Sequence, residues 1–139
     1  MKRNDFRILI AEDEPGVRKL YEKSFKQEGY EVVLVESGSE MLAELAESAF
    51  DLLITDMHLA SMSALEVLPD IRKRHPNLPI VVVSGHYVNL EQDFHQKNFS
   101  VDYFFNKPLS LSVLQKTVRK ILGIEAATDN TKGKSLFQF

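Results

Sequence analysis

The chain has 139 residues, enough for one domain with a hydrophobic core, and its net charge of −3 gives no reason to expect nucleic acid as a general partner. No stretch is long and apolar enough to span a membrane, and the first five residues are not followed by the apolar segment of a signal peptide. The sequence has no cysteine, which excludes disulfides and thiol chemistry and fits a cytoplasmic protein.

The first predicted strand, Arg7 to Ala11, runs directly into the acidic pair Glu12-Asp13. A helix is predicted from Pro15, a residue suited to the first helical position, and Gly29 is a natural stop. The next strand is predicted from 31 to 35. Helical spacing places these residues on the inner face of the first helix: Val17, Leu20, Tyr21, Ser24 and Phe25.

A second helix is predicted to open at Ser37, because Glu40 three residues later completes a capping box. The third strand, Leu52 to Thr55, runs into Asp56. After a loop, Ser63 with Glu66 forms another capping box and predicts the start of a third helix. The predicted inner face of the second helix consists of Leu42, Leu45 and Ala46.

The fourth predicted strand, Ile80 to Val83, runs into Ser84. Between Gly85 and Ser100 the apolar pattern is weak, and we expect a short or mobile helix there. The fifth strand, Tyr103 to Asn106, runs into the dipeptide Lys107-Pro108. All of the predicted strands are short, and helical patterns lie between them, as in a parallel sheet.

The last predicted helix, Leu111 to Leu122, begins after the N-cap Ser110 and ends before Gly123. The alternation of strands and helices predicts an α/β fold with a doubly wound, five-stranded parallel sheet of flavodoxin-like strand order 2-1-3-4-5. We expect one domain over residues 1–123 and a polar, disordered tail or linker over residues 124–139.

The carboxyl ends of the strands share one edge of such a sheet, and ligands bind at that edge. Carboxylates gathered there repel one another, and a bound cation relieves the repulsion. Because the available ligands are oxygen atoms and few in number, magnesium is favoured over calcium and over softer metals. The groups predicted to meet at this edge are Glu12, Asp13, Asp56, Ser84 and Lys107.

This set of groups suits phosphoryl transfer. Asp56, on a central strand, is the candidate nucleophile and would form an aspartyl phosphate. The metal and Lys107 would neutralise charge on the transferred phosphoryl group, and the Ser84 hydroxyl would donate a hydrogen bond to it. Gly85 leaves space for the phosphoryl donor to approach.

From Phe6 to about Gly123 the chain resembles the response regulator receiver domains of bacterial two-component systems, which have a CheY-like fold. The resemblance depends on motifs that occur in the expected order on the expected elements. These motifs are the acidic pair Glu12-Asp13, the acceptor Asp56, the pair Ser84-Gly85 and the pair Lys107-Pro108. A receiver domain is a phosphorylation-controlled switch in signal transduction, so the resemblance implies that function here.

The resemblance implies that Asp56 accepts a phosphoryl group from a sensor histidine kinase or a phosphotransfer protein. It implies that Asp13 binds Mg²⁺ directly, Glu12 through water and His58 through its backbone carbonyl. It also implies a cis Lys107–Pro108 bond. The protein would catalyse only its own phosphorylation and dephosphorylation, so it is not expected to be an enzyme with a separate substrate.

The switch that the resemblance implies couples the Ser84 hydroxyl to Phe104 in the fifth strand. Phosphorylation would draw Ser84 inward, and Phe104 would fill the space. The surface that changes is formed by the helix expected after Gly85, the strand 103–106 and the helix 111–122. Its expected partners are a downstream effector protein or domain and a second copy in a phosphorylation-dependent homodimer, with no direct nucleic-acid or membrane contact.

The loop after Asp56 departs from the family pattern. Ala60, Ser63 and Ala64 stand where the family usually has proline, aspartate and glycine. The alternative function is therefore a phosphate-independent adaptor, a pseudo-receiver that binds its partners constitutively. A small flavodoxin-like enzyme or nucleotide binder would need a glycine- or hydroxyl-rich loop where this chain has the acidic stretch 11–15.

Two histidines flank the predicted crevice, His58 two residues after Asp56 and His86 two residues after Ser84. One interpretation is that they tune the lifetime of the phosphoryl group by gating water or by sensing pH. The other, which we favour, is that both are ordinary exposed loop residues.

Overall fold

The computed structural model describes residues 5–59, 64–85 and 101–124. Its strands are β1 (Arg7–Ala11), β2 (Glu31–Val35), β3 (Leu52–Asp56), β4 (Ile80–Ser84) and β5 (Tyr103–Asn106). The helices within these ranges are α1 (Pro15–Gln27), α2 (Gly38–Glu47), α3 (Ala64–Arg74) and α4 (Leu111–Leu122). The helix expected between Gly85 and Ser100 falls on residues 86–100, which lie outside the described residues. No helix in the described ranges is long and apolar enough to cross a membrane.

The five strands form one parallel sheet in the order β2-β1-β3-β4-β5, which confirms the predicted doubly wound fold. All residues of β3 and β4 are buried, as expected for strands covered on both faces. The strands end nearly level, since Ala11 pairs with Thr55, Asp56 with Val83 and Ser84 with Asn106. The residues that follow these ends therefore meet at one edge.

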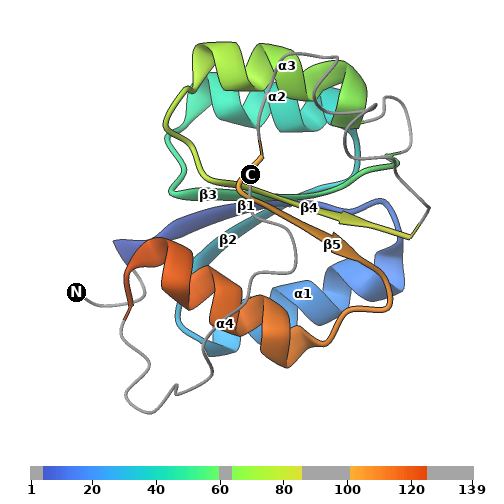
Figure 1. Ribbon diagram of the computed structural model, residues 1–139, viewed down its shortest axis with the longest axis vertical. Coiled ribbons are helices and arrows are strands. Elements are labelled where there is room, and N and C mark those ends of the chain that lie inside the picture. Colours follow the sequence, from blue (N-terminus) through green and yellow to red (C-terminus); the bar gives the residue numbers. More distant parts are fainter. Residues whose placement is uncertain (1–4, 60–63, 86–100, 125–139) are drawn as a thin grey trace.

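Two hydrophobic cores fill the spaces between the sheet and its helices. Helices α2 and α3 cover one face, and α1 and α4 cover the other, so the fold has three layers (Figure 1). Alternation along each strand divides the side chains between the faces: Leu9, Leu53 and Phe104 pack in the core under α2 and α3, whereas Tyr103 and Phe105 pack in the opposite core.

The predicted helix ends are confirmed where the structure describes them. Pro15 begins α1, and the Ser37 hydroxyl accepts a hydrogen bond from the Glu40 N–H at 3.2 Å. The Ser110 hydroxyl accepts one from the Val113 N–H at 3.4 Å. Gly123 ends α4 with a φ of 71°, a left-handed conformation that glycine adopts without strain. The other capping box cannot be compared, because Ser63 lies outside the described residues.

Two residues assigned to inner helix faces are exposed, so those assignments are wrong. Leu20 in α1 is 50% exposed, because it lies about 60° around the helix from Val17 and falls outside the buried stripe. Ala46 in α2 is exposed because it lies one residue, about 100°, beyond the buried Leu45. Met41, four residues before Leu45, takes the inner position instead.

Asp51 precedes β3 and Asp102 precedes β5, and each forms two hydrogen bonds with the backbone of the first residue of a neighbouring strand. The Asp51 N–H donates to the Arg7 carbonyl at 2.8 Å, and its carboxylate accepts the Arg7 N–H at 2.8 Å. Asp102 does the same with Ile80, at 2.8 and 2.7 Å. Arg72 of α3 adds an ion pair to the Asp102 carboxylate at 3.3 Å. These aspartates therefore satisfy backbone groups at the sheet edge opposite the site.

We predict that Asp102→Ala lowers the free energy of unfolding by about 1–3 kcal/mol, because it removes the acceptor of the N–H of Ile80, a fully buried residue. Urea denaturation measures this. Asp70→Ala is the matched control, because Asp70 pairs with Arg74 on the surface and its loss should cost less than about 0.5 kcal/mol. Equal losses in the two variants would contradict this role of Asp102.

Candidate functional site

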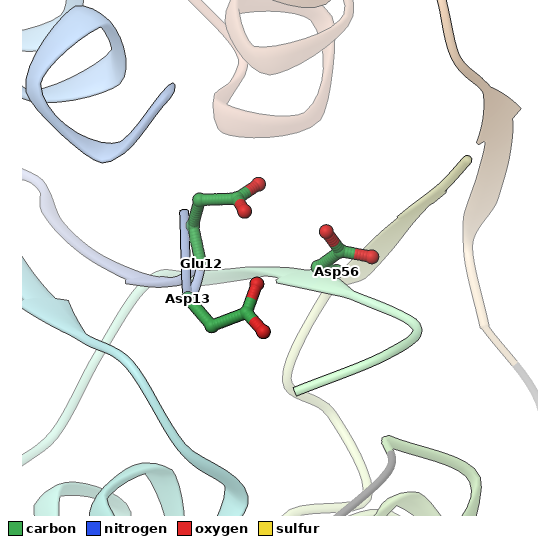
Figure 2. Close-up of side chains that lie close together, drawn as sticks. All are labelled: Glu12, Asp13 and Asp56. Carbon is green, nitrogen blue, oxygen red and sulfur yellow. The ribbon is translucent and has the colours of Figure 1, made fainter. Parts of the chain in front are cut away.

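Three carboxylates converge at the carboxyl edge of the sheet (Figure 2). Glu12 and Asp13 follow β1, and Asp56 is the last residue of β3. One oxygen from each of the three lies within 4.8 Å of the others. Glu12 and Asp56 are 1% and 8% exposed, whereas Asp13 is exposed. The structure therefore brings together the acidic groups that the sequence analysis assigned to a metal site.

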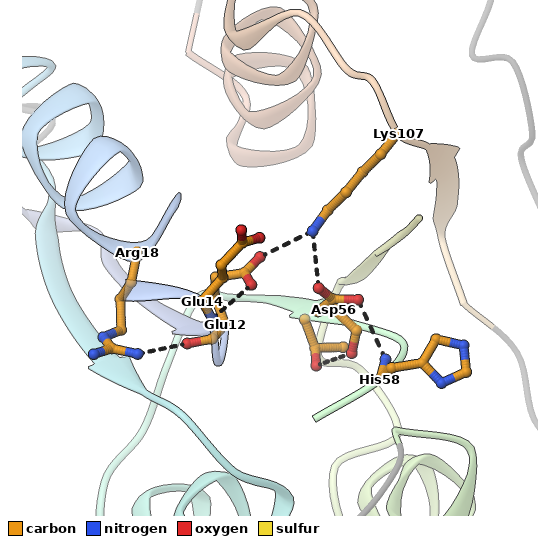
Figure 3. A network of polar contacts seen from close by, with 7 residues as sticks. Glu12, Glu14, Arg18, Asp56, His58 and Lys107 are labelled. Atoms are coloured by element: carbon orange, nitrogen blue, oxygen red, sulfur yellow. Dashed lines mark hydrogen bonds and ion pairs between the residues drawn. The ribbon is translucent and has the colours of Figure 1, made fainter. Parts of the chain in front are cut away.

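Lys107 reaches this cluster from the end of β5 (Figure 3). Its Nζ lies 2.9 Å from Asp56 Oδ2 and 3.3 Å from Glu12 Oε1. The Lys107 N–H donates to the Ser84 carbonyl at 2.7 Å, which anchors the residue beside β4. The Lys107–Pro108 bond is cis, as the sequence analysis expected. The ammonium thus joins residues that are 51 and 95 positions away along the chain.

Each of the two buried carboxylates is held at both oxygens. While Lys107 takes one oxygen of each, the Glu14 N–H donates to Glu12 Oε2 at 3.1 Å and the His58 N–H donates to Asp56 Oδ1 at 3.2 Å. Hydrogen bonds to ionised groups are strong, so these contacts fix both carboxylates in position. The nearby backbone therefore orients the acidic groups without help from a ligand.

Burial and charge act in opposite directions on the ionisable groups of the site. Burial raises the pKa of Glu12, with a further increase from the charge of Asp56, while the Glu14 N–H and Lys107 lower it. Burial by itself would lower the pKa of Lys107, but the hydrogen bond and charge of Asp56, followed by those of Glu12, raise it above its usual value. Lys107 is therefore a cation at neutral pH.

The donor set fits a hard divalent cation. Three carboxylates and one ammonium leave two negative charges uncompensated if all four groups are ionised, which equals the charge of one such ion. All available donors are oxygen atoms, which suits Mg²⁺ or Ca²⁺. Asp13, on the exposed side, leaves room for water and for a phosphate oxygen, the coordination that Mg²⁺ usually keeps.

The two residues assigned to the switch lie on neighbouring strands. Ser84 ends β4 and is fully buried, and Phe104 of β5 is 1% exposed. Phe104 pairs with Val82 in the sheet and packs in the same core, and Ser84, two residues after Val82, points to that same face. The expected pair is thus on one face of the sheet.

The loop residues singled out in the sequence are described only in part. The His58 side chain is exposed, and its backbone lies beside Asp56, whereas His86 lies outside the described residues. Ala60 and Ser63 also lie outside them. Ala64 is buried at the start of α3, and its N–H donates to the Met57 carbonyl at 2.9 Å. This bond connects the helix to the end of β3 without the family's glycine.

The sequence analysis missed Arg18 of α1. Its Nη1 donates to the Glu12 carbonyl at 3.1 Å (Figure 3). The same atom lies 3.3 Å from Glu36 Oε2 in the loop after β2. The available signal was a cation in the first turns of a helix that follows an acidic pair, but that pattern alone does not identify which atom it contacts.

Comparison with known families gives a match to the response regulator receiver domain over residues 8–119. The transcriptional regulatory protein GlrR of Escherichia coli K12 is 30% identical over 123 residues, 88% of this chain and 28% of GlrR. ZraR of Salmonella typhimurium is also 30% identical over 123 residues, 88% of this chain and 27% of ZraR. The chain therefore spans less than a third of the length of these relatives.

Solved structures show the same similarity. The response regulator TrrA of Thermotoga maritima, in complex with Mg²⁺ and BeF, superposes with a TM-score of 0.74 at 30% identity, covering 84% of this chain and 98% of TrrA. A CheY-like receiver domain from Methanospirillum hungatei gives a TM-score of 0.75 at 28% identity, covering 86% of this chain and 95% of that domain.

We predict that Mg²⁺ binds to this protein and raises its melting temperature, and that Asp13→Asn weakens the affinity at least about tenfold by removing one charged ligand. The chain has no tryptophan, so isothermal calorimetry is the direct measurement. Asp70→Asn makes the same charge change at an exposed residue of α3 that pairs with Arg74, and it should bind Mg²⁺ like the wild type. An Asp13→Asn affinity equal to that of the control would exclude Asp13 as a ligand.

Proposed function

The chain belongs to the response regulator receiver domain family, and from this premise we propose that it is a phosphorylation-controlled switch in which Asp56 accepts a phosphoryl group. The observation that carries the proposal is the contact of the Asp56 carboxylate with Lys107 Nζ at 2.9 Å, beside the acidic pair after β1. A nucleophilic carboxylate, an ammonium and an oxygen-donor cation site are the parts that transfer of a phosphoryl group to aspartate requires.

In the proposed reaction a carboxylate oxygen of Asp56 attacks the phosphorus atom of the donor. The new O–P bond forms as the bond breaks between phosphorus and the donor, a phosphohistidine of a sensor kinase or phosphotransfer protein. The Lys107 ammonium, already at the Asp56 carboxylate, moves to an oxygen of the transferred group and stabilises its charge. Attack of water on the aspartyl phosphate later releases inorganic phosphate and restores the carboxylate.

The residues that would hold Mg²⁺ are Asp13 and Asp56 directly, Glu12 through water and His58 through its backbone carbonyl. When bound, Mg²⁺ offsets negative charge on the phosphoryl oxygens and helps to align the group with the nucleophile. The protein's own residues keep Asp56 oriented, since Lys107 and the His58 N–H hold its two oxygens. The protein acts only on itself in this scheme, so we do not propose a separate substrate.

Ser84 and Phe104 provide the proposed switch. A phosphoryl group on Asp56 would attract the Ser84 hydroxyl, and Phe104 on the same face would shift toward the space that Ser84 leaves. Phe104 belongs to β5, and the helix α4 follows it along the chain; β5 and α4 form the described part of the proposed output surface. A local change in charge would in this way alter a surface that a partner contacts.

The proposed partners are a histidine kinase or phosphotransfer protein, a downstream effector and a second copy bound after phosphorylation. GlrR and ZraR are named as transcriptional regulators, which supports an effector role in gene control for proteins that carry this kind of domain. A cytoplasmic location would place the domain with such partners. Because the loop after Asp56 departs from the family pattern, a phosphate-independent adaptor is the alternative function. The following experiment distinguishes it from the phosphorylated switch.

We predict that incubation with Mg²⁺ and acetyl phosphate adds one phosphoryl group to the wild-type protein, measured as intact mass. The adduct should be absent from Asp56→Asn and from samples with excess chelator, because the nucleophile or the metal is then missing. Asp70→Asn should be phosphorylated like the wild type.

A wild-type protein that binds Mg²⁺ but forms no adduct with acetyl phosphate or with a phosphorylated histidine donor would contradict the acceptor role. A protein that neither binds Mg²⁺ nor forms an adduct would support the phosphate-independent adaptor. An adduct that persists in Asp56→Asn would place the acceptor at another residue.

A further inference from the structure

Arg18 connects two loops at the functional edge of the sheet through one atom. Its Nη1 donates to the Glu12 carbonyl at 3.1 Å and lies 3.3 Å from Glu36 Oε2. The contact with Glu12 is a hydrogen bond to a backbone oxygen, and the contact with Glu36 is an ion pair with a carboxylate. The side chain is 25% exposed, and Glu36, at 58%, holds it from the solvent side. The guanidinium is thus fixed between the ends of β1 and β2.

Glu12 is held at every polar group. Its N–H donates to the Val35 carbonyl at 3.0 Å, which extends the pairing of β1 with β2, and its carbonyl accepts from Arg18. Its carboxylate contacts the Glu14 N–H and Lys107. Of the two contacts to its backbone, the one at the carbonyl is made by a side chain, that of Arg18.

Asp13 is held much less firmly. It is exposed, and within the described ranges its carboxylate has no hydrogen-bond partner. The Glu12 carbonyl belongs to the peptide plane that joins Glu12 to Asp13, and peptide planes are rigid. The direction in which Asp13 leaves the strand end therefore depends on where that carbonyl points. Figure 2 shows the Asp13 carboxylate directed toward Asp56.

We propose that Arg18 is a positioning residue for the metal site: by holding the Glu12 carbonyl it fixes the Glu12–Asp13 peptide plane and directs the Asp13 carboxylate toward Asp56. The inference rests on the proposed function, because it assigns Arg18 to the Mg²⁺ site of that function. Residues that orient metal ligands from outside the coordination sphere commonly change metal affinity about 10–100-fold when they are replaced.

Charge alone predicts the opposite result. Arg18 is a cation close to an acidic site, so its positive charge repels Mg²⁺ and its removal would tighten binding. Positioning predicts weaker binding, because an unheld peptide plane leaves Asp13 free to turn away. The direction of the change in Mg²⁺ affinity therefore distinguishes the two roles.

The experiment is calorimetric titration of Mg²⁺ into wild type, Arg18→Met, Arg18→Lys and Lys19→Met. Arg18→Met keeps an apolar stem and loses the donor, and we expect its affinity to fall about tenfold. Arg18→Lys keeps the charge but loses the planar guanidinium. The positioning role therefore predicts weaker Mg²⁺ binding by this variant, whereas an effect of charge alone predicts an unchanged affinity. Lys19→Met removes one positive charge from an exposed neighbour and should bind as tightly as wild type or tighter.

Thermal unfolding in the presence of chelator identifies variants that fail to fold. If Arg18→Met fails to fold, the comparison of Arg18→Lys with wild type tests the proposal. Unchanged or tighter Mg²⁺ binding by both variants would overturn the positioning role and leave the proposed function intact. A wild-type protein that does not bind Mg²⁺ would overturn the metal site and this role together.

Discussion

The contact of one ammonium with two buried carboxylates is the interaction on which the site depends. Lys107 follows β5, yet it pairs with Asp56 at the end of β3 and with Glu12 after β1, so it reaches across β4. Two buried carboxylates this close would be costly without a cation between them. The lysine makes the arrangement stable and leaves enough negative charge, with Asp13, for a divalent cation to complete it.

Much of this arrangement follows from the sequence, because all strands of a parallel sheet have their carboxyl ends at the same edge. The apolar runs that became β1, β3 and β4 are buried on both faces, so their pattern identified them, and the residues at their ends necessarily meet at one edge. The register that levels Asp56 with Val83, and Ser84 with Asn106, then brings the Asp56 carboxylate and the Lys107 ammonium together, with Ser84 at the end of the strand between them. Local capping signals at Ser37 and Ser110 marked the helix starts correctly.

What could not be predicted depends on contacts between elements that no local pattern specifies. Arg18 Nη1 contacts the Glu12 carbonyl after β1 and the Glu36 carboxylate after β2, two loops that only the folded sheet brings to one helix. Asp102 binds the start of β4 because β5 begins beside it, and nothing around Asp102 in the sequence indicates that partner. Leu20 and Ala46 lie at the borders of helix faces, and how far the buried stripe extends there depends on the packing of neighbouring elements.

The most direct test of the central claim is a crystal structure of the protein with Mg²⁺ and beryllofluoride, a mimic of the phosphoryl group. The account predicts beryllofluoride on the Asp56 carboxylate, Lys107 Nζ in contact with a fluorine atom, and the Asp13 carboxylate bound to Mg²⁺. A structure with Mg²⁺ in the acidic cluster but no beryllofluoride on Asp56, and with Lys107 still paired to Asp56 and Glu12, would contradict it.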